Sequence, residues 1–186
     1  MTDRITYVLV DGENIDATLG GSILGRRPQP HERPRWDRVL EFAREEWDQP
    51  VTGLFFLAAN HELPMGFIQA LTAIGFRAVP LSGDADEKVV DIAIQRTLTA
   101  LAARDEADVM LASNDGDFIE TLDPLVGPRR QTALLAFREF RNSGFAALQE
   151  RGLEFFDLEY DVKTFNERLP RIRVIPIDEF DPLDFL

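Results

Sequence analysis

The sequence contains no cysteine and only two histidines, His31 and His61, among 186 residues. The absence of cysteine excludes disulfide bonds, thiolate zinc sites, thiol nucleophiles and iron–sulfur clusters held by cysteine. Two histidines are also too few for a histidine-rich metal centre. We therefore expect none of these kinds of site in the protein.

Long apolar runs are missing as well. No stretch approaches the roughly 20 apolar residues that a membrane-spanning helix requires. The polar start at residues 1–4 lacks the basic and then apolar pattern of a signal peptide. We therefore expect a soluble, cytoplasmic protein that does not use a membrane as a partner.

Basic residues are outnumbered, because 33 acidic residues stand against 20 basic ones and the formal net charge is −13. This balance argues against a broad attraction to nucleic acid, although it leaves room for a local basic patch. Lys88 and Lys163 are the only lysines. The arginines suit bidentate contacts with phosphate, but a GC-rich genome would produce the same bias.

A length of 186 residues favours a single compact domain. We expect this domain to span residues 1–170. Its insertion at about 20–34 is rich in arginine, proline and glycine, which predicts a long loop. Residues 171–186 form an acidic C-terminal segment, either a disordered tail or an arm that packs on the domain or on a partner. Residues 171–175 could attach this segment as an edge strand.

Short β-rich runs alternate with helical patterns along the chain, which predicts an α/β domain with a mostly parallel central sheet. The expected strands are 5–10, 51–58, 76–81, 107–112, 132–137 and 153–158. The expected helices are 35–47, 63–74, 87–103, 118–126 and 142–151. Runs such as Leu54–Leu57 do not alternate polar with apolar residues, so helices should cover both faces of the sheet.

Aspartates follow two of the expected strands. Asp11 comes directly after the first strand, and Asp115 and Asp117 follow the fourth. In open α/β sheets, ligands bind beyond the carboxyl ends of the strands, and a strand order of 3-2-1-4-5 makes the first and fourth strands neighbours. The three carboxylates would then converge on one cleft, where their repulsion calls for a cation. The alternative is that each aspartate caps a turn or the next helix.

Asp91 is the only polar residue in the run from Val89 to Ile94. The expected helix around it follows the third strand, so its first turn starts at the same edge of the sheet. Asp91 can therefore point into the same cleft. The alternative is a thin solvated stripe on which Lys88 and Asp91 form an ion pair.

Three segments together resemble the NYN branch of the PIN-like nucleases, including its LabA-like members. They are Val10–Asn14, Glu87–Asp91 and Ser113–Phe118, and the resemblance covers about residues 5–137. The resemblance implies a PIN-like three-layer fold with strand order 3-2-1-4-5. It also implies a ribonuclease site that depends on Mg²⁺ or Mn²⁺.

The resemblance assigns contacts with the metal, or with water bound to it, to four aspartates: Asp11, Asp91, Asp115 and Asp117. Carboxylates without histidine or cysteine fit Mg²⁺ or Mn²⁺ and fit zinc poorly. Such an ion lowers the pKa of a bound water, orients the hydroxide toward the scissile phosphorus and offsets charge on the leaving oxygen. We expect Asp11 and Asp115 to be direct ligands and the other two to act directly or through water.

Four polar neighbours are candidate contacts for the RNA phosphate: Asn14, Lys88, Ser113 and Asn114. The resemblance implies supporting roles for the first three. Each residue also has a structural alternative. Asn14 could cap a helix, Lys88 could pair with an aspartate, and the other two could shape their turn.

RNA binding would need positive charge beside this acidic centre. Arginines gather in two regions, near the insertion (Arg26, Arg27, Arg33, Arg35 and Arg38) and near the fifth strand (Arg129, Arg130, Arg138 and Arg141). The alternative is that they are ordinary solvated side chains. Trp36 and Trp47 are predicted to be core residues of a helix rather than platforms for stacked bases.

The leading hypothesis is a metal-dependent endoribonuclease that hydrolyses RNA phosphodiester bonds. The first alternative is a non-catalytic NYN module, regulatory or scaffolding. It would act through RNA binding, a protein partner of the C-terminal segment, or self-association into a homo-oligomer. A second alternative, a small-molecule phosphatase, is suggested by Asp115–Asp117. It is weaker, because phosphoaspartyl phosphatases carry their paired acids after an early strand.

Overall fold

The structure is a computed structural model that describes residues 4–60, 62–172 and 174–186. The start of the chain at residues 1–3, His61 and Arg173 lie outside the described residues. Within the described ranges, six strands form one sheet: β1 (Ile5–Asp11), β2 (Val51–Ala58), β3 (Phe76–Leu81), β4 (Ala107–Ala112), β5 (Thr132–Ala136) and β6 (Glu154–Asp157). Their order is β3-β2-β1-β4-β5-β6, and every pairing is parallel. The predicted order 3-2-1-4-5 is confirmed, with β6 added beside β5.

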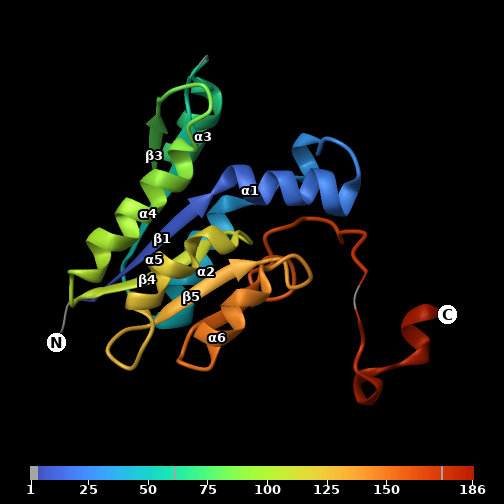
Figure 1. Cartoon of the computed structure of the whole chain (residues 1–186). Coiled ribbons are helices and arrows are strands. Elements are labelled where there is room, and N and C mark those ends of the chain that lie inside the picture. The colour runs from blue at the N-terminus through green and yellow to red at the C-terminus, as the bar shows by residue number, and fades with distance from the viewer. Residues whose placement is uncertain (1–3, 61, 173) are drawn as a thin grey trace.

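Helices cover both faces of the sheet, as predicted, and give the three layers seen in Figure 1. One face carries α1 (Gly12–Ala17), α2 (Trp36–Trp47) and α3 (Met65–Ile74). The other carries α4 (Val89–Ala102), α5 (Ile119–Leu122) and α6 (Ala146–Gln149). Strands β4 and β5 are buried at every residue, which agrees with the apolar runs at 109–112 and 133–136.

Proline shortens two of the expected helices. The helix expected over 63–74 begins at Met65, directly after Pro64. The helix expected over 118–126 divides into a 3-10 turn at Gly116–Phe118, α5, and a second 3-10 turn that contains Pro124. Pro64 disfavours a helical conformation in the residue before it, so α3 begins after it, and Pro124 lacks the N–H that would continue α5.

The prediction that residues 20–34 form a loop throughout is wrong in its first part. Helix α1 continues directly into a π-helix, Thr18–Leu24, that ends at Gly25. A 3-10 turn, Pro30–Glu32, follows before α2 begins. The first half of the insertion is therefore an ordered extension of α1.

Burial of apolar side chains explains this extension. Leu19 is fully buried, and Ile23 and Leu24 pack against the same core, which outweighs the low helix propensity of the neighbouring glycines. At Gly20, an added Cβ would lie 3.1 Å from Cδ of Pro28. The glycine therefore lets the returning chain pass close to the helix.

The prediction that residues 171–175 form an edge strand is wrong for the part of that segment that the structure describes. A side chain attaches the segment instead. The guanidinium of Arg171, which is 1% exposed, lies 2.6 Å from Asp157, 2.5 Å from Glu139 and 3.1 Å from Glu159. Beyond Arg171 the chain runs away from the sheet layers (Figure 1). The division between a domain over 1–170 and a separate segment stays a prediction.

Trp36 and Trp47 are 9% and 8% exposed, which confirms the prediction that both belong to the core. None of the helices in the described part of the chain combines the length and the apolarity needed to cross a bilayer.

Candidate metal centre

The sheet order brings the three motif segments to one edge. Strands β1 and β4 are neighbours, and Val10 pairs with Ala112. The chain that leaves β1 at Asp11 therefore lies next to the turn that begins at Ser113. Helix α4 follows β3 and carries Asp91 in its first turn. Parallel strands place all of their carboxyl ends at the same edge, which explains how residues distant in sequence meet there.

Three carboxylates form the centre of the site. Oxygens of Asp91, Asp115 and Asp117 lie within 4.8 Å of one another. Asp91 comes from α4 and the other two from the turn after β4. Burial, followed by the neighbouring charge of Asp115, raises the pKa of Asp91 above its ordinary value. The cluster therefore carries a repulsion that a bound cation would relieve.

Asp11 adds a fourth carboxylate that is 2% exposed. Its Oδ2 accepts a hydrogen bond from the Ser113 hydroxyl at 2.9 Å, and its Oδ1 accepts from the N–H of Asn14 at 3.4 Å. Burial raises the pKa of Asp11 to about 6, and the charges of Asp91 and Asp115 act in the same direction. Asp11 is not one of the three residues whose oxygens gather within 4.8 Å, so its link to them is electrostatic and through Ser113.

The capping alternatives are also present in the structure. Asp11 caps α1 through its bond from Asn14, and Asp115 accepts from the N–H of Asp117 at 2.9 Å. Each aspartate uses only one oxygen in its cap. Capping therefore orients both carboxylates. Oδ2 of Asp115 accepts no hydrogen bond from the described residues, whereas Oδ2 of Asp11 already accepts from Ser113.

Ser113 and Asn114 hold the turn together from inside. Ser113 is fully buried, and its hydroxyl also accepts from the N–H of Asp115 at 3.1 Å. The side chain of Asn114 accepts from the N–H of Phe137 at 2.8 Å and donates to Oδ1 of Asn14 at 3.3 Å. The same Oδ1 accepts the backbone N–H of Asn114 at 2.8 Å. These bonds tie β1, β4 and β5 together and favour the turn-shaping alternative for both residues.

Lys88 is paired with the acidic cluster. Its Nζ lies 3.5 Å from Oδ2 of Asp117 and 3.8 Å from Oδ2 of Asp91. The charge of Asp117, followed by its hydrogen bond and the charge of Asp91, raises the pKa of Lys88. One ammonium against three carboxylates leaves the cluster with net negative charge.

Three residues that support the turn after β4 are not predicted from the sequence. The Gln95 side chain donates to the carbonyl oxygen of Asp117 at 3.2 Å, and the hydroxyl of Thr18 accepts from Nδ2 of Asn114 at 3.3 Å. The N–H of Asn142 donates to the carbonyl oxygen of Asn114 at 3.1 Å. Gln95 lies one helical turn after Asp91, which is a usable signal. Thr18 and Asn142 reach the site only through the tertiary fold.

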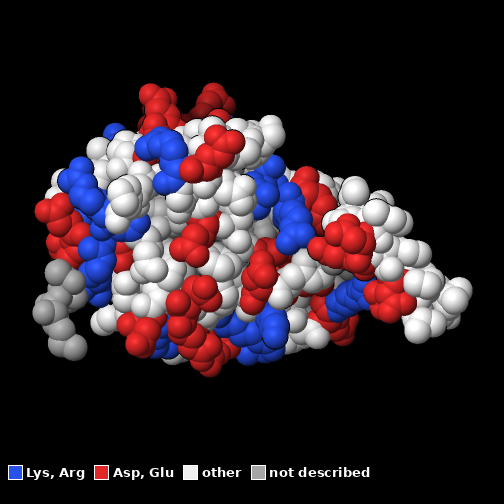
Figure 2. All heavy atoms as spheres, turned by 90° about the horizontal axis from the view of Figure 1, so that it is seen from below, with Lys and Arg blue, Asp and Glu red and all other residues white. Residues whose placement is uncertain are grey.

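The arginines near the insertion are mostly paired. Their partners are Glu32 for Arg26, Asp16 for Arg33, Asp37 for Arg35, and the carbonyl oxygens of Lys163 and Phe165 for Arg38. The guanidinium of Arg27 makes no hydrogen bond or ion pair with the residues that the structure describes. Figure 2 shows basic and acidic side chains interspersed over one face rather than gathered in a single basic band. Most of these arginines are therefore better described as ordinary surface side chains than as a patch that binds RNA.

The four arginines near β5 do not form one cluster beside the aspartates. Arg130 donates to the carbonyl oxygens of Leu101 and Ala102, at the edge of the sheet where β5 begins. Arg138 and Arg141 follow the other end of β5, and Arg141 lies 3.6 Å from the ring centroid of Phe155. Only this second pair lies at the edge that carries Asp115.

A model of the NYN domain family matches residues 5–159. The chain belongs to the NYN family. A search of curated protein sequences found no match. Membership places this NYN domain in the PIN-like nuclease superfamily, as its resemblance implied, and agrees with the sheet order.

The donor set of this NYN domain fits a divalent metal ion. The clustered ligand atoms are all carboxylate oxygens, which are the ligands that Mg²⁺ and Mn²⁺ prefer and that zinc does not. PIN-like nucleases are generally dependent on divalent metals, so the cluster and the family point to the same kind of site.

Proposed function

We propose that this NYN domain is an endoribonuclease that hydrolyses RNA phosphodiester bonds with Mg²⁺ or Mn²⁺ held by its aspartates. The observation that carries the proposal is the approach of Asp91, Asp115 and Asp117 to within 4.8 Å. They come from two separate elements and meet at the edge where α/β sheets bind ligands. A purely structural turn after β4 would not require the third carboxylate from α4.

Each aspartate has a role in this proposal. Asp91, Asp115 and Asp117 hold the ion, and Asp11 completes the set directly or through water. When bound, the ion supplies a water of lowered pKa and offsets negative charge on the phosphate. The Ser113 hydroxyl fixes the Asp11 carboxylate by its bond of 2.9 Å and also accepts from the N–H of Asp115.

Lys88 and Asn14 are the residues best placed to contact a phosphate. The side chain of Lys88 is 71% exposed, so its ammonium can turn from the carboxylates to a phosphate oxygen once a metal ion neutralises them. Nδ2 of Asn14 makes no hydrogen bond with the described residues and stays available as a donor. Ser113 and Asn114 act as positioning residues, because their polar groups are used inside the turn.

A non-catalytic module is the second candidate, favoured by two observations. The formal net charge is −13 and most arginines near the insertion are paired, which weakens attraction to RNA. In the C-terminal segment, Leu183 is 76% exposed and Phe185 is 63% exposed. Exposed apolar side chains among acidic residues fit a protein partner.

The deciding experiment measures metal binding and RNA cleavage separately. Wild type, Asp91→Asn and Asp115→Asn would be titrated with Mn²⁺ by calorimetry and assayed on a labelled single-stranded RNA with Mg²⁺, Mn²⁺ or EDTA. We expect each variant to lose at least about 100-fold in cleavage rate and to bind Mn²⁺ more weakly. Glu41→Gln on α2, which removes one exposed negative charge away from the site, should change neither.

Two results would contradict the proposal. Mn²⁺ binding by wild type without cleavage of any RNA would favour the non-catalytic module. Cleavage that persists in both variants would place the activity elsewhere or in a contaminant.

A further inference from the structure

An aromatic pocket lies at the carboxyl ends of β1 and β2, on the face of the sheet that carries α1, α2 and α3. It has a volume of about 210 Å³. Trp36, Phe55 and Phe67 form its apolar wall, and Asp16 and Arg33 lie among its polar lining residues. The volume is below the roughly 300–1,000 Å³ typical of sites for drug-sized ligands, so the pocket suits one small planar group.

The aromatic wall is partly open. The Phe55 ring centroid lies 5.2 Å from that of Trp36 and 5.3 Å from that of Phe67, both edge to face. Trp36 and Phe55 are buried, whereas Phe67 is 40% exposed. An exposed ring backed by buried rings offers a rigid surface on which a nucleobase stacks.

The pocket begins one residue away from the proposed metal site. Gly12, which follows Asp11, lines it, and a Cβ on Gly12 would lie 2.6 Å from Cζ of Phe55. The glycine therefore allows the start of α1 to touch the aromatic wall. A group seated in this pocket would therefore contact the residue that follows Asp11 in the chain.

The polar groups of the pocket are available to a ligand. Asp16 and Arg33 lie 3.5 Å apart, and their side chains are 43% and 41% exposed. So long and exposed an ion pair contributes little stability, and both groups can exchange it for a base. A carboxylate accepts N–H groups of a base edge, and a guanidinium donates to its acceptors.

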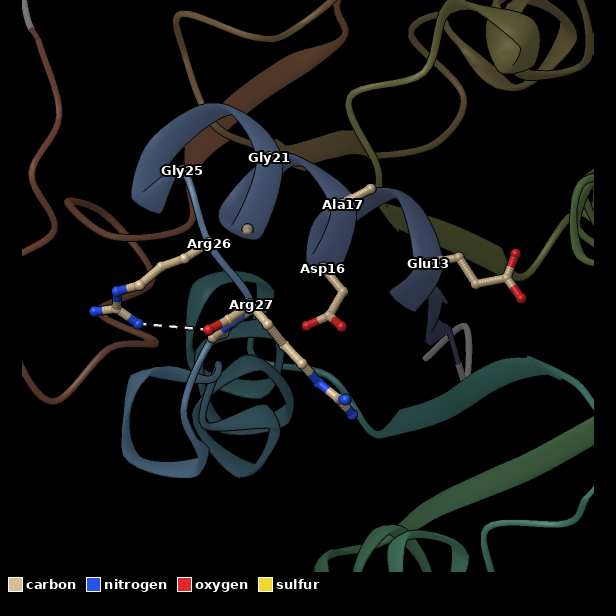
Figure 3. Close-up of a pocket in the computed structure, with 9 residues that line it drawn as sticks. Glu13, Asp16, Ala17, Gly21, Gly25, Arg26 and Arg27 are labelled. Carbon is tan, nitrogen blue, oxygen red and sulfur yellow. Dashed lines mark hydrogen bonds between the residues drawn. The ribbon is translucent and has the colours of Figure 1, made fainter.

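A second, more open hollow continues from the pocket along α1. It has a volume of about 600 Å³ and shares Glu13 and Asp16 with the aromatic pocket. Figure 3 shows Arg27 extending toward the side on which Asp16 lies, whereas Arg26 points away. Arg27, which has no partner among the described residues, is thus placed to meet a phosphate next to the seated group.

From these observations we infer that the aromatic pocket binds one unpaired nucleobase of the RNA strand, with the adjoining phosphate at Arg27. This inference rests on the proposed function, because it names the substrate class of the same site. A paired base cannot enter, so the substrate is single-stranded at this position.

The test compares two strands that share a backbone. An eight-nucleotide single-stranded RNA and its fully abasic counterpart would be titrated by fluorescence anisotropy in EDTA, where the proposed cleavage cannot occur. Phe67→Ala should weaken binding of the base-bearing strand by about 5- to 150-fold and leave the abasic strand unchanged. Phe140→Ala provides the matched control, because Phe140 is 38% exposed and lies outside the pocket.

Other outcomes overturn the inference and separate it from the proposed function. If RNA binds and is cleaved with Mn²⁺ but Phe67→Ala has no effect, the base site is wrong and the nuclease stands. Equal binding of a blunt duplex would also contradict the base site. If Phe67→Ala leaves RNA binding intact but abolishes self-association in sedimentation, the pocket holds an apolar protein side chain instead. If no RNA binds at all, with or without Mn²⁺, both proposals fail.

Discussion

Two aspartates, Asp11 and Asp108, are buried at opposite ends of neighbouring strands and have opposite pKa shifts. Asp11 lies where β1 ends, and Asp108 lies near the start of β4. Asp108 is 0% exposed and Asp11 is 2% exposed. Asp108 accepts hydrogen bonds from Nε of Arg4 at 2.8 Å, from Gln49 at 2.9 Å and from the N–H of Gln131 at 2.8 Å. Burial acts to raise the pKa of Asp108, but the bonds from Arg4 and Gln49 outweigh it and the pKa is lowered.

Asp11 lacks such compensation. It has one hydroxyl donor at 2.9 Å and one backbone donor at 3.4 Å, and burial raises its pKa to about 6. Burial acts to raise the pKa of both carboxylates, and only the partners of Asp108 reverse its effect and stabilise the charged form. A carboxylate left without a cation at a ligand-binding edge is a candidate functional group, whereas Asp108 is a structural one.

Loss of the Asp108 carboxylate should destabilise the protein more than any other change considered. Asp108→Asn should lower the free energy of unfolding by about 3 kcal/mol, because it leaves the Arg4 guanidinium without its anion. Asp11→Asn is the matched control and should cost nothing at pH 7 in EDTA, since it removes a buried charge with no cation beside it. Urea unfolding with unchanged m-values would measure both. Equal losses in the two variants would show that the two carboxylates have the same role.

The two aspartates should also differ in how they make stability depend on pH. The folded-state pKa of Asp11 is raised to about 6, so the folded protein holds this proton more tightly than the unfolded chain. Its contribution to stability therefore falls as pH rises from about 4 to about 6, by about 2 to 3 kcal/mol in total. For Asp108, whose pKa is lowered, the contribution is present at neutral pH and is lost as pH falls below the ordinary aspartate range.

The measurement is the unfolding free energy in EDTA at several pH values for wild type, Asp11→Asn and Asp108→Asn. Between pH 4 and pH 6, Asp11→Asn should gain stability relative to wild type, and Asp108→Asn should not. A pH profile of Asp11→Asn that runs parallel to that of wild type over this interval would contradict the assigned shift.

A bound divalent ion should offset the repulsion among the carboxylates of the acidic cluster and so stabilise the folded protein. At ten times its dissociation constant, Mn²⁺ should stabilise wild type by about 1.4 kcal/mol. Asp91→Asn should remove most of this gain, and Glu41→Gln should keep it. Thermal unfolding with and without Mn²⁺ is the measurement. A gain of the same size in Asp91→Asn would show that the ion binds elsewhere.

The sequence predicts the sheet well, and most clearly where strands are buried on both faces, as β4 and β5 are. Short apolar runs such as Val109–Leu111 are typical of such strands, and the aspartates that follow two of the expected strands indicate the edge where the site lies. The first half of the insertion is mispredicted because Gly20 and Gly21 indicate a loop by propensity. The burial of Leu19 reverses that preference, and burial depends on the tertiary fold.

The candidate site is predictable in its charged residues and not in their partners. Asp91 and Asp115 stand out because they are acidic residues at strand and helix ends. The hydrogen bonds around the site, from Ser113 to Asp11 and from Gln95 to the carbonyl oxygen of Asp117, depend on which donors the fold brings within reach. The same limit applies to the aromatic pocket, because nothing in the spacing of Phe55 and Phe67 indicates that the two rings meet.

Lys88 is the cation that offsets part of the negative charge of the acidic cluster, and its loss should have the smallest effect. Its Nζ lies 3.5 Å from Asp117 and 3.8 Å from Asp91, so a metal ion must compete with it for the carboxylates. Lys88→Gln should therefore raise the affinity for Mn²⁺ a few-fold and weaken RNA binding slightly, with little change in melting temperature because the pair is exposed. Calorimetry with Mn²⁺ and anisotropy with RNA would measure the two opposite changes. Loss of Mn²⁺ affinity in Lys88→Gln would instead mean that the ammonium helps to arrange the carboxylates, and that the cluster is organised before any cation arrives.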